Sequence, residues 1–229
     1  DNKSINWDRV VTNAEIEIQA LTHIHQYLIK EVIEKCPKEK NPDPKINALI
    51  EILSEHFQTN SEKPILIFSK YTDTLSEVKK AVIEFLNEEH QYSNGYGVFT
   101  GQEKKLYEPG FPDEINTDKD DITYSLEEGR IKIVFCSSAA GEGLNLQAAS
   151  TLINIDVPWV AADLEQRIGR IARLGQKEKI VNILNIWYPN AESEMYKRII
   201  YRASLGSFVV GESPPLVSTD IKESVEDNR

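Results

Sequence analysis

The sequence predicts an α/β fold, a doubly wound parallel sheet covered by helices. From residue 64 onward, short apolar runs alternate with longer amphipathic segments, which is the order of strands and helices in such a sheet. The runs are almost continuously apolar, as expected for strands that are buried on both faces. The predicted strands are residues 65–68, 97–99, 131–135, 152–155 and 181–186.

Three amphipathic helices are predicted before and between the first strands. Apolar residues recur at helical spacing over residues 14–34, close to a capping box. A second helix should begin after Asp43, which can cap it, with Pro44 in its first turn. A third should connect the first two strands and begin at the capping box of residues 74–77.

The rest of the chain suggests a division into one main domain and two flanking pieces. Residues 102–130 are long, polar and acidic, and we interpret them as a surface insertion. A last helix around Met195 should pack back on the sheet. We therefore expect a helical segment at 1–42, the main domain at 43–204 and an irregular tail at 205–229.

The composition limits the partners and the compartment. The 229 residues include 26 basic and 37 acidic ones, a formal net charge of −11, so phosphate contacts must be local rather than spread over a basic surface. No apolar run approaches the length of a membrane span, so no membrane partner is expected. Cys36 and Cys136 share no metal-ligand spacing with the four histidines, which favours reduced thiols, no metal site and a cytoplasmic location.

The strongest chemical signal is residues 163–176, Asp-Leu-Glu-Gln-Arg-Ile-Gly-Arg-Ile-Ala-Arg-Leu-Gly-Gln. We predict one short helix here, on which Gln166, Arg170 and Arg173 share a face. Two guanidinium groups on one face favour the phosphates of a nucleotide. A solvated basic helix would explain a bare Arg-x-x-Arg, but it does not explain the whole string.

Three further motifs follow predicted strands. Residues 137–147 combine small residues with two glycines, so their backbone could approach a ligand closely and bind an anion. Ser69-Lys70 and Thr100-Gly101 are weaker signals, because hydroxyl residues after a strand are more often ordinary helix caps. Ligands of such sheets bind at the carboxyl ends of the strands, where all of these motifs lie.

In chain order, these motifs resemble motif IV, the Thr-Gly motif, motif V and motif VI of superfamily 2 helicases. The ending of the last motif, residues 173–176, is similar to the Arg-x-Gly-Gln of Swi/Snf-related ATPases, and Glu142 brings the match nearer to their RapA-like bacterial branch. The resemblance covers roughly residues 43–200. It implies a RecA-like fold, the C-terminal lobe of a helicase, flanked by N-terminal and C-terminal helices.

The resemblance also implies roles for individual residues. Arg170 and Arg173 would be arginine fingers for ATP, with Gln166 beside the γ-phosphate or its attacking water. Arg167, turned off that face by one residue, would make a structural or lobe-coupling contact rather than act as a finger. The nucleotide would face Gly141, Gly143 and Asn145. The nucleic-acid backbone would be held by Ser69, Lys70, Thr100, Gly101 and Ser137.

Two motifs of a complete ATPase are missing from the sequence. There is no Gly-x-x-x-x-Gly-Lys-Ser/Thr loop for the phosphates and no Asp-Glu-x-His after an apolar strand for Mg²⁺. A first RecA-like lobe of the same polypeptide is therefore expected to precede residues 1–42 and to hold Mg²⁺ and most of the ATP. The chain alone should not hydrolyse ATP.

The expected activity is ATP-driven movement on double-stranded DNA. Proteins bound on the DNA or displaced from it are expected partners, and a bacterial protein would be nucleoid-associated. Two alternatives remain open at this point: a non-catalytic RecA-like scaffold or docking module, and the lobe of an RNA helicase.

Overall fold

The structure, a computed structural model, describes residues 7–35, 43–60, 63–88, 95–137, 146–158, 160–188 and 197. The chain forms two compact units, Asp1–Asn47 and Ala48–Arg229. Most of the predicted last helix around Met195 and the whole predicted tail at 205–229 lie outside the described residues. The domain boundaries expected from the sequence stay predictions.

The first described residues are helical, as the apolar spacing predicts. Helix α1, Trp7–Tyr27, continues as a π-helical turn, η1, Leu28–Ile33. The predicted helix at 14–34 is thus confirmed over most of its length, although it begins earlier. Helix α2, Pro44–Asn60, begins as predicted, because the backbone N–H of Lys45 donates to Oδ1 of Asp43 at 2.8 Å.

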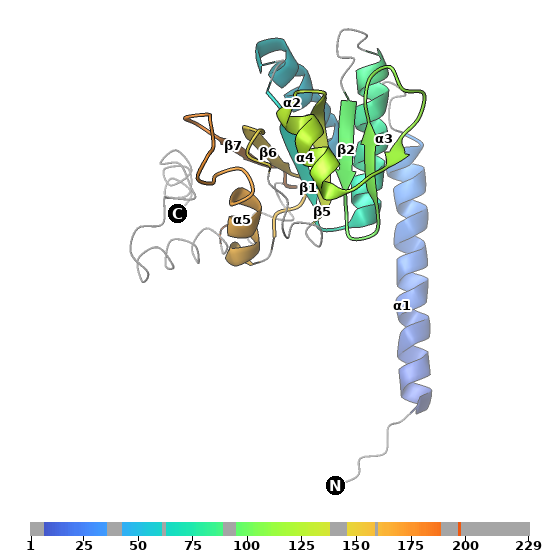
Figure 1. The fold of residues 1–229 in the computed structure, drawn as a ribbon. Coiled ribbons are helices and arrows are strands. Elements are labelled where there is room, and N and C mark those ends of the chain that lie inside the picture. The colour runs from blue at the N-terminus through green and yellow to red at the C-terminus, as the bar shows by residue number, and fades with distance from the viewer. Residues whose placement is uncertain are drawn as a thin grey trace, which may run out of the picture. The chain divides into compact units, whose positions relative to one another are not determined.

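A seven-stranded sheet forms the centre of the second unit, in the order β4-β3-β2-β5-β1-β6-β7 (Figure 1). Its parallel part contains all five predicted strands, whereas β3 and β4 pair antiparallel at one edge. The strands are β1 Ile65–Ser69, β2 Gly95–Phe99, β3 Lys104–Tyr107, β4 Ile115–Asn116, β5 Ile131–Ser137, β6 Thr151–Asn154 and β7 Asn182–Asn185.

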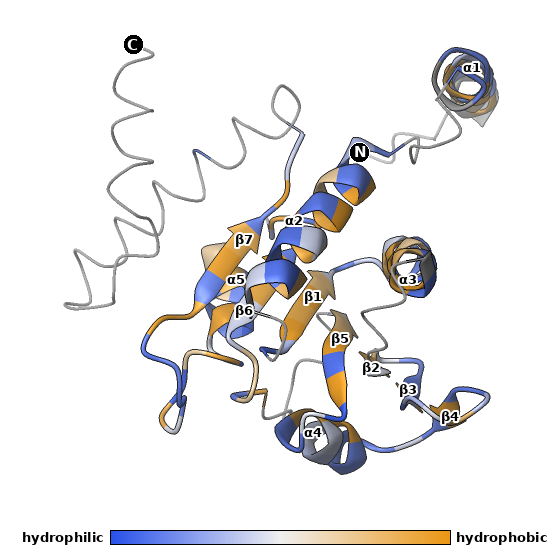
Figure 2. Ribbon diagram, turned by 90° about the horizontal axis from the view of Figure 1, so that it is seen from above, coloured by the Kyte–Doolittle hydropathy of each residue, from blue (hydrophilic) through white to orange (hydrophobic). Residues whose placement is uncertain are grey.

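Helices lie on both faces of this sheet. Figure 2 shows residues 48–60 of α2 and helix α3, Thr72–Glu88, on one face, and helix α4, Lys119–Glu127, on the other. Strands β1 and β5 are buried along their whole length, as strands covered on both faces must be. The predicted doubly wound α/β fold is therefore confirmed.

The interpretation of residues 102–130 as a surface insertion is wrong. This segment contains β3, β4 and α4, and it buries Leu106, Ile122 and Leu126 in the core cluster that includes Leu66 and Phe68 of β1. The acidic residues suggested a solvent-exposed loop, but several of them lie at the start of α4. The side chain of Asp118, for example, accepts the N–H groups of the first turn and caps the helix.

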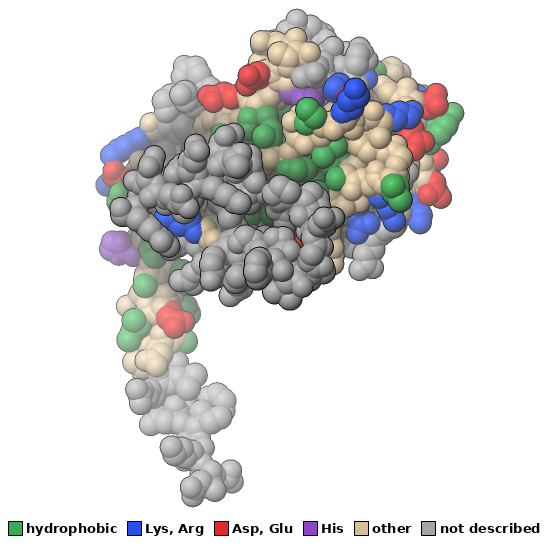
Figure 3. All heavy atoms as spheres, turned by 90° about the vertical axis from the view of Figure 1, so that its left-hand side faces the viewer, with side chains coloured by type: hydrophobic (Ala, Val, Ile, Leu, Met, Phe, Trp, Pro, Cys, Tyr) green, Lys and Arg blue, Asp and Glu red, His purple; other side chains and the backbone are tan. Residues whose placement is uncertain are grey.

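The surface carries mixed charge. Figure 3 shows Lys and Arg side chains together with Asp and Glu side chains among the coloured residues of the face that it draws. This agrees with the net charge of −11. Within the same residues, no helix combines the length and apolar character needed to cross a membrane.

Candidate functional site

Asp156 links three chain segments at the carboxyl ends of the parallel strands. It follows β6, and its Oδ2 accepts the hydroxyl of Ser69 at 2.6 Å and the backbone N–H of Lys70 at 2.7 Å. Its Oδ1 lies 3.0 Å from Nη2 of Arg167. One carboxylate therefore joins the motif that ends β1 to the motif that contains the arginines.

Arg167 is the buried end of this link. Its side chain is 4% exposed, and Nη1 donates to Oδ1 of Asn154 at 2.8 Å and to the carbonyl of Asp156 at 2.9 Å. The guanidinium also lies over the ring of Phe68, 5.8 Å from its centre. Asn154 is held in turn by Asn185, to which its amide donates at 2.9 Å. The sequence left a structural or a lobe-coupling contact open for Arg167, and these bonds are structural contacts within the lobe.

The arginine motif is not one continuous helix. Helix α5, Ala161–Ile168, ends with Gly169 as its C-cap, and tight turns follow. The predicted single helix over residues 163–176 is therefore wrong, and Arg170 and Arg173 do not continue a helical face from Gln166. The residue at the end is Gly169, and glycine is a poor helix former.

The three predicted catalytic side chains nevertheless remain accessible. Gln166 and Arg173 are exposed and Arg170 is half-buried, whereas Arg167 between them is buried. Arg170 is close enough to Cys136, near the end of β5, for its charge to act on the thiol. Burial raises the pKa of the Cys136 thiol, and the positive charge of Arg170 partly opposes that rise. The ion pair of Arg167 and Asp156 thus fixes α5 against the sheet, while Gln166, Arg170 and Arg173 stay outside the core.

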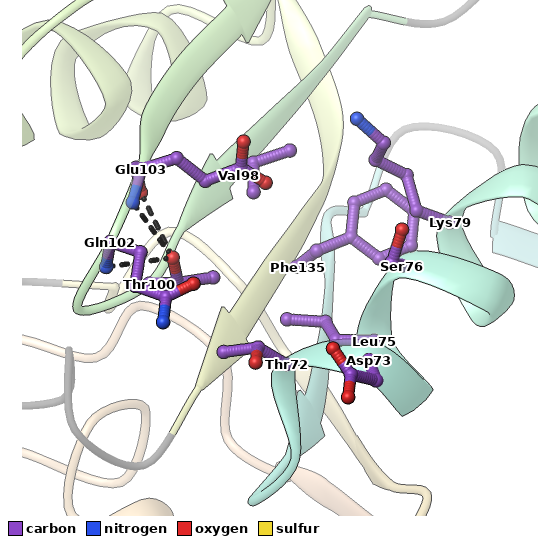
Figure 4. Close-up of a pocket in the computed structure, with 10 residues that line it drawn as sticks. All are labelled: Thr72, Asp73, Leu75, Ser76, Lys79, Val98, Thr100, Gln102, Glu103 and Phe135. Carbon is purple, nitrogen blue, oxygen red and sulfur yellow. Dashed lines mark hydrogen bonds between the residues drawn. The ribbon is translucent and has the colours of Figure 1, made fainter.

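A second feature near the carboxyl ends of the strands, an edge here called the rim, is a cavity of about 340 Å³. It lies between the start of α3 and the β2–β3 turn. Thr100 shapes the turn, because its Oγ1 accepts the backbone N–H groups of Gln102 at 3.2 Å and Glu103 at 2.9 Å. Figure 4 shows side chains of α3 facing this turn across the cavity. The lining residues are Thr72, Asp73, Leu75, Ser76, Lys79, Val98, Thr100, Gln102, Glu103 and Phe135.

The predicted nucleic-acid contacts differ in exposure. Lys70 and Gly101 are exposed, while Thr100 is 5% exposed and lines the cavity. Ser69 is fully buried with its hydroxyl on Asp156, so its surroundings favour a positioning role over a direct contact. Ser137 is also buried, at 1% exposure, and its hydroxyl has no hydrogen-bond partner among the described residues.

The predicted nucleotide-facing residues Gly141, Gly143 and Asn145 lie outside the described residues. Across the described ranges, no group of three or more His, Cys, Asp or Glu side chains could hold a metal ion. The carboxylate of Glu114 accepts hydrogen bonds from the Lys79 ammonium and the Tyr96 hydroxyl, each at 2.8 Å.

Sequence reasoning missed the polar residues that hold the arginine motif. Asp156 and Asn154 stand at the end of an apolar run and Asn185 at the end of another, which is a weak but usable signal, since polar groups there face the functional edge of the sheet. Their connection to Ser69 and Arg167 could not be read from the chain, because the bonded residues are up to 87 positions apart.

Comparison with known proteins identifies a family and a relative that the sequence of this chain matches. Residues 44–175, more than half of the chain, match the family model "Helicase conserved C-terminal domain". Over 95 residues the chain is 42% identical to the uncharacterized ATP-dependent helicase YqhH of Bacillus subtilis (strain 168); the match covers 41% of this chain and 17% of YqhH.

Two solved structures have a similar fold. The C-terminal part of the Fun30 ATPase domain matches 80% of this chain and 52% of its own length, with a TM-score of 0.50 and 20% identity. The DUF1998 helicase MrfA, bound to DNA and AMPPNP, matches 81% of this chain and 23% of its own length, with a TM-score of 0.52 and 15% identity. At these identities the likeness concerns the fold alone.

Proposed function

The chain belongs to the helicase conserved C-terminal domain family, and we propose that it is the second RecA-like lobe of an ATP-dependent translocase on double-stranded DNA. The proposal places the chain in the Swi/Snf-related group, on the strength of the motif resemblance in residues 137–147 and 163–176. In this proposal, the lobe contributes arginine fingers to ATP and one part of the nucleic-acid track.

The observation that carries the proposal is the burial of Arg167 against Asp156 beside the more exposed Gln166, Arg170 and Arg173. A guanidinium that serves structure is buried and bonded, whereas one that serves a ligand must stay accessible. The motif thus contains one anchored arginine and two that could reach a nucleotide. An accessible guanidinium fits phosphate oxygens, because it offers a planar set of donors and keeps its charge.

We assign Arg170 and Arg173 to charge stabilisation on the transferring phosphoryl group, a role worth about 10³ to 10⁵ in rate in other nucleotide hydrolases. Gln166 would lie beside the γ-phosphate or the attacking water. Another RecA-like lobe would hold the phosphates through its phosphate loop and would bind Mg²⁺, which neutralises charge on the phosphates. Closure of the cleft between the lobes would couple the state of the nucleotide to a step along DNA.

The nucleic-acid track, meaning the surface that contacts the nucleic-acid backbone, would include Lys70, Thr100 and Gly101. Lys70 offers an exposed ammonium, and the Thr100 turn borders the cavity at the start of α3. Ser69 would act indirectly, because its hydroxyl and the Lys70 N–H are bound to the same carboxylate. Asp156 would thereby connect the track to the arginine motif.

Mutation of the two accessible arginines tests the proposal. In the full-length protein, Arg170→Ala and Arg173→Ala should each lower the turnover of ATP by about 10³-fold while nucleotide binding persists. Lys177→Ala, which removes an exposed cation just beyond the motif, serves as the control and should retain turnover. Full activity in both arginine variants would refute the assignment, and the 229-residue chain alone should not hydrolyse ATP.

A further inference from the structure

Residues 173–176 form a turn, here called the Arg173 turn, that has no apolar anchor at its tip. Leu174 is 98% exposed, and Gly175 has a φ of +101°, which a side-chain-bearing residue adopts only with strain. Inside the turn, the N–H of Gln176 donates to the carbonyl of Arg173 at 3.0 Å. Apolar packing at the tip does not fix this turn, so polar contacts must hold it in place.

Gln147 supplies one such contact from a distant part of the chain. Its Nε2 donates to the carbonyl of Leu174 at 2.6 Å, across 27 positions of sequence. Its side chain also fills the space beside Gly175, because a Cβ there would lie 3.2 Å from Oε1 of Gln147. Gln147 therefore both bonds the tip of the Arg173 turn and packs against it.

Gln176 holds the other end of the turn with both ends of its amide. Its Nε2 donates to the carbonyls of Ala149 at 3.0 Å and Ile171 at 2.9 Å, and its Oε1 accepts the N–H of Glu178 at 3.0 Å. One glutamine therefore joins three backbone segments and uses its donors and its acceptor together.

We propose that Gln147 and Gln176 are positioning residues, which set the place of Arg173 for ATP hydrolysis by clamping the Arg173 turn. The segment that carries Gln147, and whose Ala149 carbonyl accepts from Gln176, is anchored in the core, since Leu146 and Ala149 are 1% and 0% exposed. Gln147 binds the backbone of the turn, and Gln176 ties the end of the turn to the backbone on either side and to Ala149, so both would act on hydrolysis through the position of Arg173.

This inference rests on the proposed function, because it needs Arg173 to act as a finger. A catalytic group displaced by ~1 Å can lose about 10²-fold in rate, so loosening the turn should affect catalysis more than binding. Gln147 also lies two residues after Asn145, a predicted contact of the nucleotide. The same short segment would then carry a nucleotide contact and one half of the clamp.

The test uses ATP hydrolysis by the full-length protein in the presence of duplex DNA. Gln147→Met keeps the length of the side chain but removes the donor, and Gln147→Glu places a carboxylate oxygen against the Leu174 carbonyl. Both should lower kcat by about 10- to 100-fold, with the KM for ATP and the Kd for DNA within about twofold of the parent. Gln58→Met, on the exposed side of α2, is the matched control and should leave kcat unchanged.

A double-mutant cycle separates positioning from general destabilisation. In an Arg173→Ala background, Gln147→Met should lower kcat no further, since the residue through which it acts is gone. Equal losses in both backgrounds, or an unchanged kcat in both Gln147 variants, would overturn the clamp. Gly175→Ala perturbs the same contact from the turn side and should reproduce the loss if the Gln147 variants are insoluble.

The two proposals fail in different ways. If Arg173→Ala abolishes turnover while Gln147→Met, Gln147→Glu and Gly175→Ala do not, the finger assignment stands and the clamp is refuted. If Arg173→Ala keeps full turnover, the finger assignment is refuted, and the clamp falls with it.

Discussion

The guanidinium of Arg167 lies 3.0 Å from the carboxylate of Asp156, and this pair fastens helix α5 to the end of the central sheet. The side chains are 4% and 19% exposed, so water screens the interaction only weakly. The same carboxylate holds Ser69 and Lys70 at the end of β1. A change at Asp156 should therefore disturb two motifs at once.

Replacement of Asp156 by Ala should destabilise the fold strongly. The substitution leaves the buried charge of Arg167 without its carboxylate, which in other proteins costs about 3–5 kcal/mol. The free energy of unfolding, measured by urea denaturation of the chain, gives the cost directly. Glu77→Ala is the control: it breaks an exposed pair with Lys80 and should cost less than about 1 kcal/mol. Similar costs for the two variants would contradict the structural role of Asp156.

The sequence predicts the centre of this fold better than its edges. Strands such as β1 and β5 are buried on both faces, so their apolar runs are plain in the chain. The hairpin of β3 and β4 is mostly exposed, and α4 buries only Ile122, Ser125 and Leu126, so the segment has the composition of a loop. Periodicity therefore identifies elements that the core requires and misses those with one narrow buried face.

The candidate site divides in a similar way. The motifs at the strand ends can be found in the sequence, because their residue types suit phosphate and follow apolar runs. The end of α5 at Gly169 was not predicted, because a single glycine within a helical pattern is often tolerated and does not by itself mark a helix end. The contact between Asp156 and Arg167 was not predicted either, because it depends on how β6 and α5 approach each other in the fold.

Glu114 should contribute stability that depends on pH. Burial raises its pKa, but hydrogen bonds from Lys79 and Tyr96 and the nearby positive charges outweigh this effect, so the pKa lies below 4.5. A lowered pKa in the folded state means that Glu114 stabilises the fold above pH 4.5 and that this contribution is lost as the pH falls through the folded-state pKa.

The variant Glu114→Gln tests this pH dependence. Its loss of unfolding free energy relative to the parent should be largest near neutral pH and should shrink below pH 4.5. Urea denaturation at several pH values measures the difference. Glu128→Gln, at an exposed position after α4, should show little loss at any pH. A Glu114→Gln loss that does not change with pH would mean that the carboxylate charge is not responsible.

Lys70 should contribute one phosphate contact to nucleic-acid binding. Its ammonium is exposed at the end of β1, and its backbone is held by Asp156. In Lys70→Ala, affinity should fall by a similar factor for all sequences, and the slope of log K against log salt should drop by about one. Lys80→Ala, an exposed lysine further along α3, is the matched control. An unchanged slope would remove Lys70 from the track.

Duplex DNA should stimulate ATP hydrolysis by the full-length protein more than RNA does. The expectation comes from residues 144–147 and 173–176, whose sequences resemble DNA translocases more than RNA helicases. The test compares turnover with duplex DNA and with single- and double-stranded RNA of the same length and sequence, at one fixed salt concentration, because phosphate contacts depend strongly on salt. Equal or greater stimulation by RNA would assign the lobe to an RNA helicase, and no stimulation by either would favour a scaffold.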